Sequence, residues 1–201
     1  MADKFERLGK EKRDRIINAA LSEFAKYGYD NASTNVMVKE AGISKGLIFH
    51  YFGTKENLFM YLVNYCSGVI SKELNESVNL NEKDILILIQ DYIIKKLIIL
   101  QKYPSLFDFL LTAFNESNTK LKRLVLEKTH EIIEKGKIDL WNHVDPSYFK
   151  EGLDIEKTYV VIVNALEKIS LEEFSKEAVD MDSFVDILND YIDYFRKVFY
   201  R

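Results

Sequence analysis

Cysteine and proline are scarce in this chain of 201 residues, which holds one cysteine and two prolines. Few prolines favour long helices, because proline breaks a helix interior by removing a hydrogen bond. The single Cys66 excludes an intramolecular disulfide and is typical of a reducing compartment, so we expect a cytoplasmic protein. A lone cysteine is usually a small buried apolar side chain, although a redox role for Cys66 stays open.

The sequence also lacks a long uncharged apolar run. Its most apolar segment, residues 85–100, is interrupted by Asp91, Lys95 and Lys96. A membrane span needs roughly 20 apolar residues, so we expect no membrane association. The N-terminal residues are charged and lack the apolar core of a secretory signal peptide.

Patterns typical of catalysis and metal binding are missing as well. His130 and His143 have no cysteine partner and no carboxylates at ligand spacing. No nucleophile–base pair or phosphate-binding loop is recognisable. We therefore expect no enzyme, no cofactor and no metal site.

Helical periodicity is present along nearly the whole chain. Apolar residues recur at spacings of three and four, and no alternating strand pattern is found. The predicted fold is all-α with about nine helices. The expected helices cover residues 10–27, 34–41, 44–51, 54–76, 82–102, 105–116, 119–137, 155–176 and 182–200, and residues 138–154 are expected to form a loop with short turns.

Two domains are expected, with the boundary at Gly53. Residues 1–53 form a three-helix head, and residues 54–201 form a helical bundle for ligand sensing and dimerisation. The first 55 residues hold ten Lys and Arg against seven Asp and Glu, whereas the whole chain carries a net charge of −4. This uneven charge favours a polyanionic partner for the head alone.

The head contains the pattern of a helix-turn-helix. Two short predicted helices flank Gly42, and Thr34 and Ser44 stand where each helix would be capped. Lys45 and Lys55 lie in the first turns of helices, where the helix dipole disfavours a cation. A polyanion bound at these helix starts explains both lysines better than helix stability does.

These residues resemble the DNA-binding signature of the TetR family of bacterial transcriptional regulators. The similarity runs through residues 41–46 (AGISKG) and 51–58 (YFGTKENL) in order and spacing, and it includes residues 17–29 upstream. The resemblance implies that double-stranded DNA is bound by Thr34, Asn35, Ser44, Lys45, Gly46, Leu47, Phe49, His50, Tyr51 and Lys55. Within this set it assigns phosphate contacts to Thr34, Ser44, Tyr51 and Lys55, and positions toward the groove to Lys45, Leu47, Phe49 and His50.

Two positions depart from the family pattern. Phe49 stands where the family usually has tyrosine, so a hydroxyl for a phosphate is lost. Leu47 occupies a variable position that is often polar. An apolar side chain there either contacts a thymine methyl or reads no base.

The last two predicted helices are apolar on two faces. In helix 182–200 one stripe contains Leu188 and Phe195, and a second contains Tyr191 and Tyr194. Both faces must be buried, so one is expected to meet a partner chain, unless a single chain buries both. TetR-like proteins are similar in dimerising through their last two helices. The expected homodimer interface comprises Tyr159, Val163, Leu188, Tyr191, Ile192 and Phe195.

Aromatic residues are frequent between the head and these two helices. The resemblance implies that this region encloses a small-molecule effector, and a mostly apolar cavity favours a hydrophobic or aromatic one. The candidate ligand-binding residues are Tyr61, Tyr65, Tyr92, Phe107, Phe114, His130, Trp141 and Asn164. Plain core packing is the alternative for each of them.

The sequence thus predicts a homodimeric, ligand-responsive transcriptional regulator. In this family such a protein is most often a repressor that a ligand releases from a palindromic operator. Two alternatives stay open: a regulator controlled by a protein partner, and a helical-bundle enzyme or carrier with a relic DNA-binding head.

Overall fold

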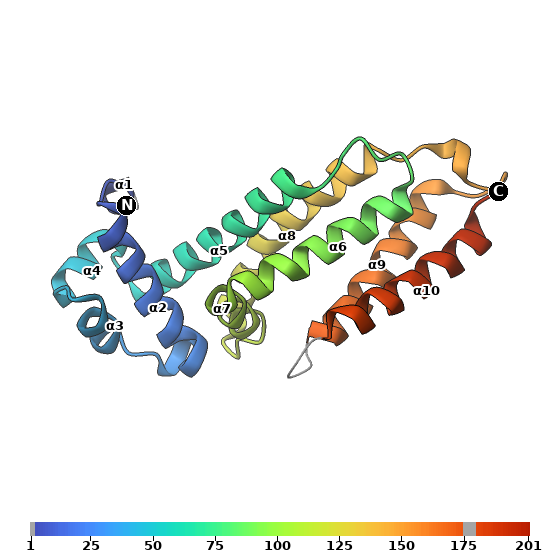
Figure 1. Ribbon diagram of the computed structural model, residues 1–201. Helices are drawn as coiled ribbons and strands as arrows, with labels where there is room; N and C mark the ends of the chain where they lie inside the picture. Colours follow the sequence, from blue (N-terminus) through green and yellow to red (C-terminus); the bar gives the residue numbers. More distant parts are fainter. Residues whose placement is uncertain (1–2, 175–179) are drawn as a thin grey trace. The chain divides into compact units, whose positions relative to one another are not determined.

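The computed structural model describes residues 3–174 and 180–201, with side chains for all of these except residues 3, 132–139 and 174. Within this part the chain is helical, and its single β-type pairing is a bridge between Phe149 and Tyr200 (Figure 1). The helices are α1 (Asp3–Glu6), α2 (Lys10–Asn31), α3 (Thr34–Ala41), α4 (Lys45–Phe52), α5 (Lys55–Ser77), α6 (Ile85–Lys102), α7 (Pro104–Phe114), α8 (Thr119–Trp141), α9 (Ile155–Phe174) and α10 (Met181–Phe199), with a 3-10 turn at Pro146–Tyr148. The all-α prediction is confirmed.

The nine predicted helices correspond to α2–α10, but three details differ. Helix α1 was not expected. Helix α2 continues past Gly28, where it was expected to stop, because Gly28 adopts a positive φ of 69° and the chain resumes helical geometry beyond this kink. Helix α8 continues to Trp141, so the expected loop is shorter. The end of the helix predicted to reach residue 176 lies outside the described residues.

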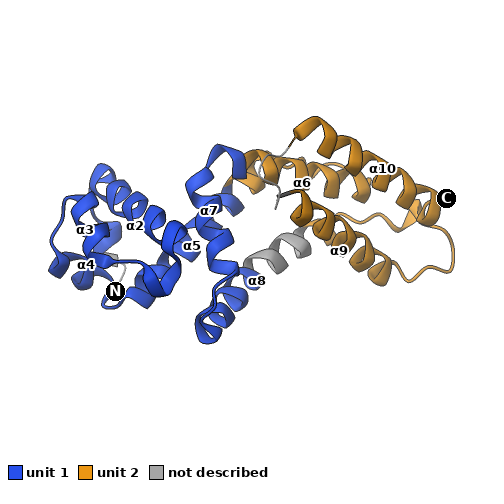
Figure 2. Ribbon diagram, turned by 90° about the horizontal axis from the view of Figure 1, so that it is seen from below, with its two compact units in different colours: residues 1–72, 100–134 blue, residues 73–99, 135–201 orange. Residues whose placement is uncertain are grey.

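The chain forms two compact units (Figure 2). Unit 1 comprises Met1–Lys72 and Leu100–Glu134, and unit 2 comprises Glu73–Ile99 and Lys135–Arg201. This structural division is not the functional one expected at Gly53. A division of roles between residues 1–53 and 54–201 stays a proposal.

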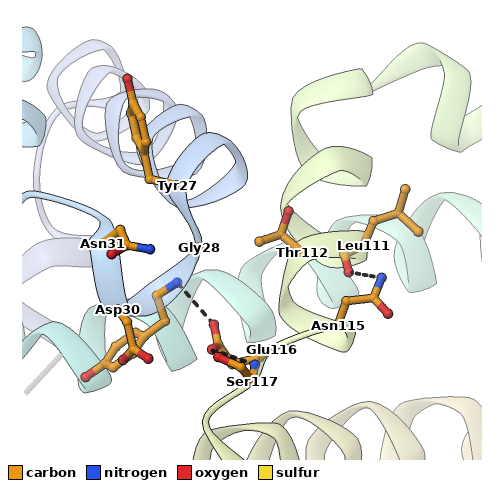
Figure 3. Close-up of a pocket in the computed structure, with 10 residues that line it drawn as sticks. Tyr27, Gly28, Asp30, Asn31, Leu111, Thr112, Asn115, Glu116 and Ser117 are labelled. Carbon is orange, nitrogen blue, oxygen red and sulfur yellow. Dashed lines mark hydrogen bonds between the residues drawn. The ribbon is translucent and has the colours of Figure 1, made fainter.

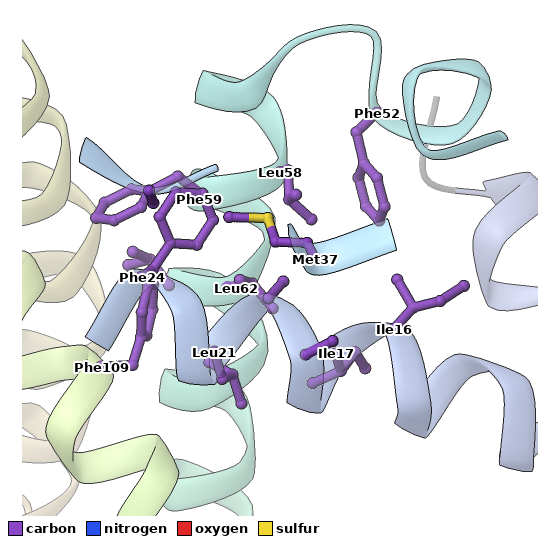
Figure 4. Packing of buried hydrophobic residues seen from close by; sticks show 14 of the residues in the cluster. Ile16, Ile17, Leu21, Phe24, Met37, Phe52, Leu58, Phe59, Leu62 and Phe109 are labelled. Carbon is purple, nitrogen blue, oxygen red and sulfur yellow. The ribbon is translucent and has the colours of Figure 1, made fainter. Parts of the chain in front are cut away.

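One aromatic core runs through unit 1 (Figure 4). The rings of Phe24 on α2, Phe59 on α5 and Phe109 on α7 are each fully buried, with centroids 5.0 Å apart for the first pair and 5.1 Å for the second. Burying one such side chain contributes roughly 1.5–3 kcal/mol. Helix α2 also packs on both α3 and α7, so α7 shares the core of the head helices.

The ends of the short helices are set by glycine and hydroxyl side chains. Gly42 ends α3 in the left-handed conformation, with φ 65°. Ser44 Oγ accepts a hydrogen bond from the Leu47 N–H at 3.3 Å, and Thr54 Oγ1 accepts one from the Asn57 N–H at 3.0 Å. The predicted cap at Ser44 is confirmed, and Thr54 caps α5 in the same way.

The predicted cap at Thr34 is wrong. Thr34 is the first helical residue of α3, and Ser33 precedes it without a capping hydrogen bond from its side chain. The carboxylate of Glu23, a buried residue of α2, instead accepts the Ser33 N–H at 2.8 Å. A residue of the preceding helix thus binds the backbone N–H of Ser33, the residue that precedes α3.

In unit 2 the end of α10 is tied to the start of α6 by a buried carboxylate. Asp84 accepts hydrogen bonds from Arg196 Nη1 at 2.6 Å, from the Tyr200 hydroxyl at 2.7 Å and from the Leu86 N–H at 3.0 Å. Burial and the Asp84 carboxylate both raise the pKa of Tyr200. The hydroxyl therefore stays protonated and donates its hydrogen bond to Asp84.

Among the described helices, none combines the length and the apolar character of a membrane span.

Candidate nucleic-acid interface

Helices α3 and α4 are both eight residues long and meet at a turn of three residues around Gly42. The inner side of α4 is formed by Ile48 and Phe52, which are 2% and 3% exposed. From α3, Val38 and Ala41 are also buried. The opposite side of α4 is left open to solvent.

The open side of this pair contains most of the residues implied in DNA binding. Lys45 is exposed and forms no ion pair with a described residue, so its charge faces solvent. Leu47 and Phe49 are partly buried and pack against the core. Thr34 is partly exposed. The remaining members of the set on this side are exposed: Asn35, Ser44, Gly46 and His50.

Tyr51 does not have the outward orientation expected for a phosphate contact. It is 7% exposed, and its ring lies edge-on to Phe5 with centroids 5.6 Å apart. Tyr51 is covered because Phe5 of α1 packs on its ring. The periodicity of the sequence did not predict α1. A phosphate contact by Tyr51 stays a prediction that depends on the resemblance alone.

Lys55 has a partner inside the chain. Its Nζ donates to the carbonyl oxygen of Asp30 at 3.2 Å and to that of Ala32 at 3.0 Å, and it lies 4.8 Å from the centre of the Tyr29 ring. These acceptors account for a cation in the first turn of α5 without an external polyanion. Lys45 therefore becomes the more informative lysine for DNA binding.

Two short helices around a glycine turn, with a buried inner side and an exposed cationic outer side, define a helix-turn-helix protein of the DNA-binding class. Residues 16–62, from α2 into α5, match the family model described as bacterial regulatory proteins, tetR family. Over these residues the chain is similar to the TetR family of regulators.

Known proteins are similar to this chain at two levels. Over 65 residues it is 35% identical to the HTH-type transcriptional repressor AcnR of Corynebacterium glutamicum, covering 32% of this chain and 35% of AcnR. Over 52 residues it is 40% identical to the HTH-type transcriptional regulator QacR of Staphylococcus aureus, covering 26% of this chain and 28% of QacR. The chain thus spans about a third of the length of these relatives.

The second level is the fold. A TetR family transcriptional regulator from Chloroflexus aurantiacus J-10-FL superimposes with a TM-score of 0.64 at 20% identity, covering 99% of this chain and 98% of that one. The likeness therefore extends over the body, where it concerns the helices and their arrangement alone.

The candidate ligand-binding residues do not form one group within a unit. Those in unit 1 are Tyr61, Tyr65, Phe107, Phe114 and His130, and those in unit 2 are Tyr92, Trp141 and Asn164. His130 and Asn164 are exposed, and the Asn164 side chain donates to the Val160 carbonyl of its own helix at 2.7 Å. Burial raises the pKa of Tyr92 to about 12, so its hydroxyl is a neutral donor. Trp141 packs on Tyr159, with ring centroids 5.2 Å apart.

A cleft of about 370 Å³ lies within unit 1, between the end of α2 and the end of α7 (Figure 3). None of the candidate ligand-binding residues lines it. Glu116 accepts the Tyr29 N–H at 3.1 Å there, and Thr112 Oγ1 donates to the Ala25 carbonyl at 3.0 Å. These contacts join α7 to the helix that supports α3. No pattern in the sequence marked the contact between Glu116 and Tyr29, because the two residues are distant along the chain.

The predicted dimer interface needs a correction. Five of its six residues lie in the interior of the single chain: Tyr159, Val163, Leu188, Ile192 and Phe195. The sixth, Tyr191, is 42% exposed. The stripe through Leu188 faces the chain's own core, which leaves the other stripe open. The exposed apolar residues of this second stripe are Tyr191, Tyr194 and Val198 on α10, and those of α9 are Val160, Val161 and Leu171.

Proposed function

We propose that this protein is a DNA-binding transcriptional regulator that binds duplex DNA through the exposed side of α3 and α4. The observation that carries the proposal is Lys45, an exposed cation without an ion-pair partner among the described residues, at the start of a helix whose opposite side is buried. The family model over residues 16–62 supports it.

The proposed active form is a homodimer joined through the exposed apolar residues of α9 and α10. These helices pack on each other, and each leaves an apolar strip open, with Val161 55% and Tyr194 59% exposed. A two-fold dimer sets two recognition helices one DNA turn apart, or about 34–36 Å, and so favours a palindromic operator.

We further propose that a small hydrophobic or aromatic effector bound in the body lowers the affinity for DNA, as expected of a repressor. Helix α5 starts at the Thr54 cap, next to α4, and continues to Ser77. A ligand can act through α5 only if it binds the conformation unable to hold DNA more tightly than the competent one.

DNA binding is tested by fluorescence anisotropy with 30-bp duplexes selected from a random pool by the parent protein. The parent is expected to lose affinity steeply as salt increases, and Lys45→Ala to reduce the slope of log affinity against log salt by about 1 per bound head. Lys122→Ala, which removes an exposed lysine of α8, is the control. Equal binding by the parent and Lys45→Ala would contradict the proposed surface.

The effector is tested separately by thermal shift with a panel of hydrophobic and aromatic compounds. A compound that raises the melting temperature and releases the selected duplex supports the effector proposal. If no compound in a broad panel stabilises the protein, control by a protein partner is favoured instead.

A further inference from the structure

The N-terminal segment of residues 3–8, which we name the N-terminal brace, is anchored beside the recognition helix α4. Phe5 is fully buried, and its ring centroid lies 4.8 Å from that of Phe52 and 5.6 Å from that of Tyr51, both on α4. A third ring, Tyr61 of α5, lies 5.3 Å away. Phe5 therefore fills the space between the two helices.

Polar contacts fix the brace as well. Glu6 Oε1 accepts the Tyr61 hydroxyl at 2.6 Å, and Glu6 Oε2 accepts Arg13 Nη1 at 3.1 Å. Arg13 also donates to the Glu6 carbonyl oxygen at 3.3 Å. The backbone closes the segment through a hydrogen bond from the Leu8 N–H to the Phe5 carbonyl at 3.0 Å. Arg13 and Tyr61 thus hold the brace in one place through Glu6.

The brace borders the outer side of α4. The Tyr51 ring, which packs on Phe5, lies 5.7 Å from the ring of His50, centroid to centroid. His50 is exposed and belongs to the set of residues implied in DNA binding. The brace thus contacts α4 at Tyr51, the residue that follows His50 along the chain.

Two cations project from this anchored segment. Lys4 and Arg7 are exposed, and neither forms an ion pair or a hydrogen bond with a described side chain. The neighbouring carboxylate of Glu6 does not neutralise them, because Arg13 and Tyr61 already occupy its two oxygens. Both cations lie outside residues 16–62, the part that the family model matches.

We propose that Lys4 and Arg7 bind backbone phosphates of DNA next to the groove that α4 enters. This inference depends on the proposed function, to which it adds a second binding surface. The contacts are to phosphates, so they position the head and contribute affinity on any sequence. Because Phe5 anchors the brace, little chain entropy is lost when the two side chains engage the duplex.

The test is the double variant Lys4→Ala/Arg7→Ala, measured on the selected 30-bp duplex and on a scrambled duplex of equal length. The slope of log affinity against log salt is expected to fall by about 1.8 for each bound head, about 0.9 for each lost phosphate contact. Affinity is expected to fall by the same factor on both duplexes. Hydroxyl-radical footprinting is expected to lose protection of the sugars that flank the half-site.

The matched control is Lys122→Ala/Arg123→Ala, which removes two exposed cations from α8 and changes the net charge equally. It is expected to keep the parental slope, which separates direct contact from a general loss of positive charge. Both double variants leave Phe5 and Glu6 intact, so the fold of the head is retained.

A second variant tests the anchor. Phe5→Ala is expected to reduce the salt slope as the double variant does, because the released brace no longer holds its cations beside α4. Circular dichroism of this variant checks that the head remains folded. If Lys4→Ala/Arg7→Ala keeps the parental slope and footprint while the parent binds DNA, the brace proposal is overturned and the proposed function stands. If the parent binds no duplex, both are overturned.

Discussion

The head and the pair α9–α10 both present an exposed surface, but the two surfaces have opposite chemistry. The head exposes Lys4, Arg7 and Lys45 over a buried aromatic core. The α9–α10 pair exposes apolar side chains, among them Val161 and Tyr194. A cationic surface fits a polyanion, whereas an exposed apolar strip fits another apolar surface. The difference supports the proposals that the head binds DNA and that the α9–α10 pair binds a second copy of the chain.

The largest effect is expected from breaking the apolar strip. Tyr194→Asp places a charge where the partner helix would pack, so the dimer should dissociate. Loss of the second head lowers affinity for the selected duplex by roughly 10²–10⁴-fold, because linked binding is lost. Analytical ultracentrifugation and anisotropy measure the two changes.

The control for this variant is Leu126→Asp, which changes a 46%-exposed apolar residue of α8. It should leave the sedimentation coefficient and the affinity unchanged. A Tyr194→Asp protein that sediments as the parent does would show that this strip does not join two chains.

The next effect concerns the carboxylate that ties α10 to α6. Asp84→Ala leaves Arg196 and Tyr200 without their acceptor and should lower the free energy of unfolding by about 3 kcal/mol. Urea denaturation measures the loss. Asp186→Ala, an exposed residue of α10, should change stability by less than about 0.5 kcal/mol. Equal stability of the two variants would show that the contacts of Asp84 do not stabilise unit 2.

A smaller effect is expected where α7 meets α2. Burial alone would raise the pKa of Glu116, but its hydrogen bonds from the backbone of Asn118, Tyr29 and Ser117 outweigh this and lower the pKa. Glu116→Ala leaves these donors unpaired and should cost about 1–2 kcal/mol at neutral pH.

The sign of the pH dependence follows from the lowered pKa of Glu116. The stabilisation by this carboxylate is complete above its ordinary pKa of 4.5 and is lost as pH falls through the lower value. The stability difference between the parent and Glu116→Ala should therefore shrink in acid. A difference that stays constant in urea denaturation from neutral pH to below 4.5 would contradict this role.

No effect is expected from thiol reagents on the native protein. Cys66 is fully buried, and burial raises the pKa of its thiol, so little reactive thiolate exists at neutral pH. Labelling should require denaturant, which serves as the positive control. Rapid labelling of the native protein would instead support a redox role.

The sequence allowed the helices and the turn chemistry of the head to be predicted. Gly42 and Ser44 act locally, so their neighbours along the chain were enough to place them. The partners of Lys55 and Tyr51 were not visible, because they come from α2 and from α1. Periodicity does not predict which backbone carbonyl or which aromatic ring will contact a given side chain in the folded protein.

The choice between the two stripes of α10 also exceeded what the sequence shows. Both stripes contain apolar residues, with Leu188 in one and Tyr194 in the other, and the sequence does not show which side faces the core. Packing within unit 2 buries Leu188 completely and leaves Tyr194 59% exposed. Two apolar faces on one helix predict that both are buried. Which of them packs within its own chain depends on tertiary packing.

The central claim is that α3 and α4 read duplex DNA as part of a two-fold dimer. Selection of duplexes from a random pool by the parent protein, followed by sequencing, tests this claim most directly. An inverted repeat is expected, with half-sites centred about 10–10.5 bp apart or at a multiple of that spacing, and Lys45→Ala should weaken its enrichment. A pool that shows no enriched sequence after repeated selection at moderate salt would contradict the claim.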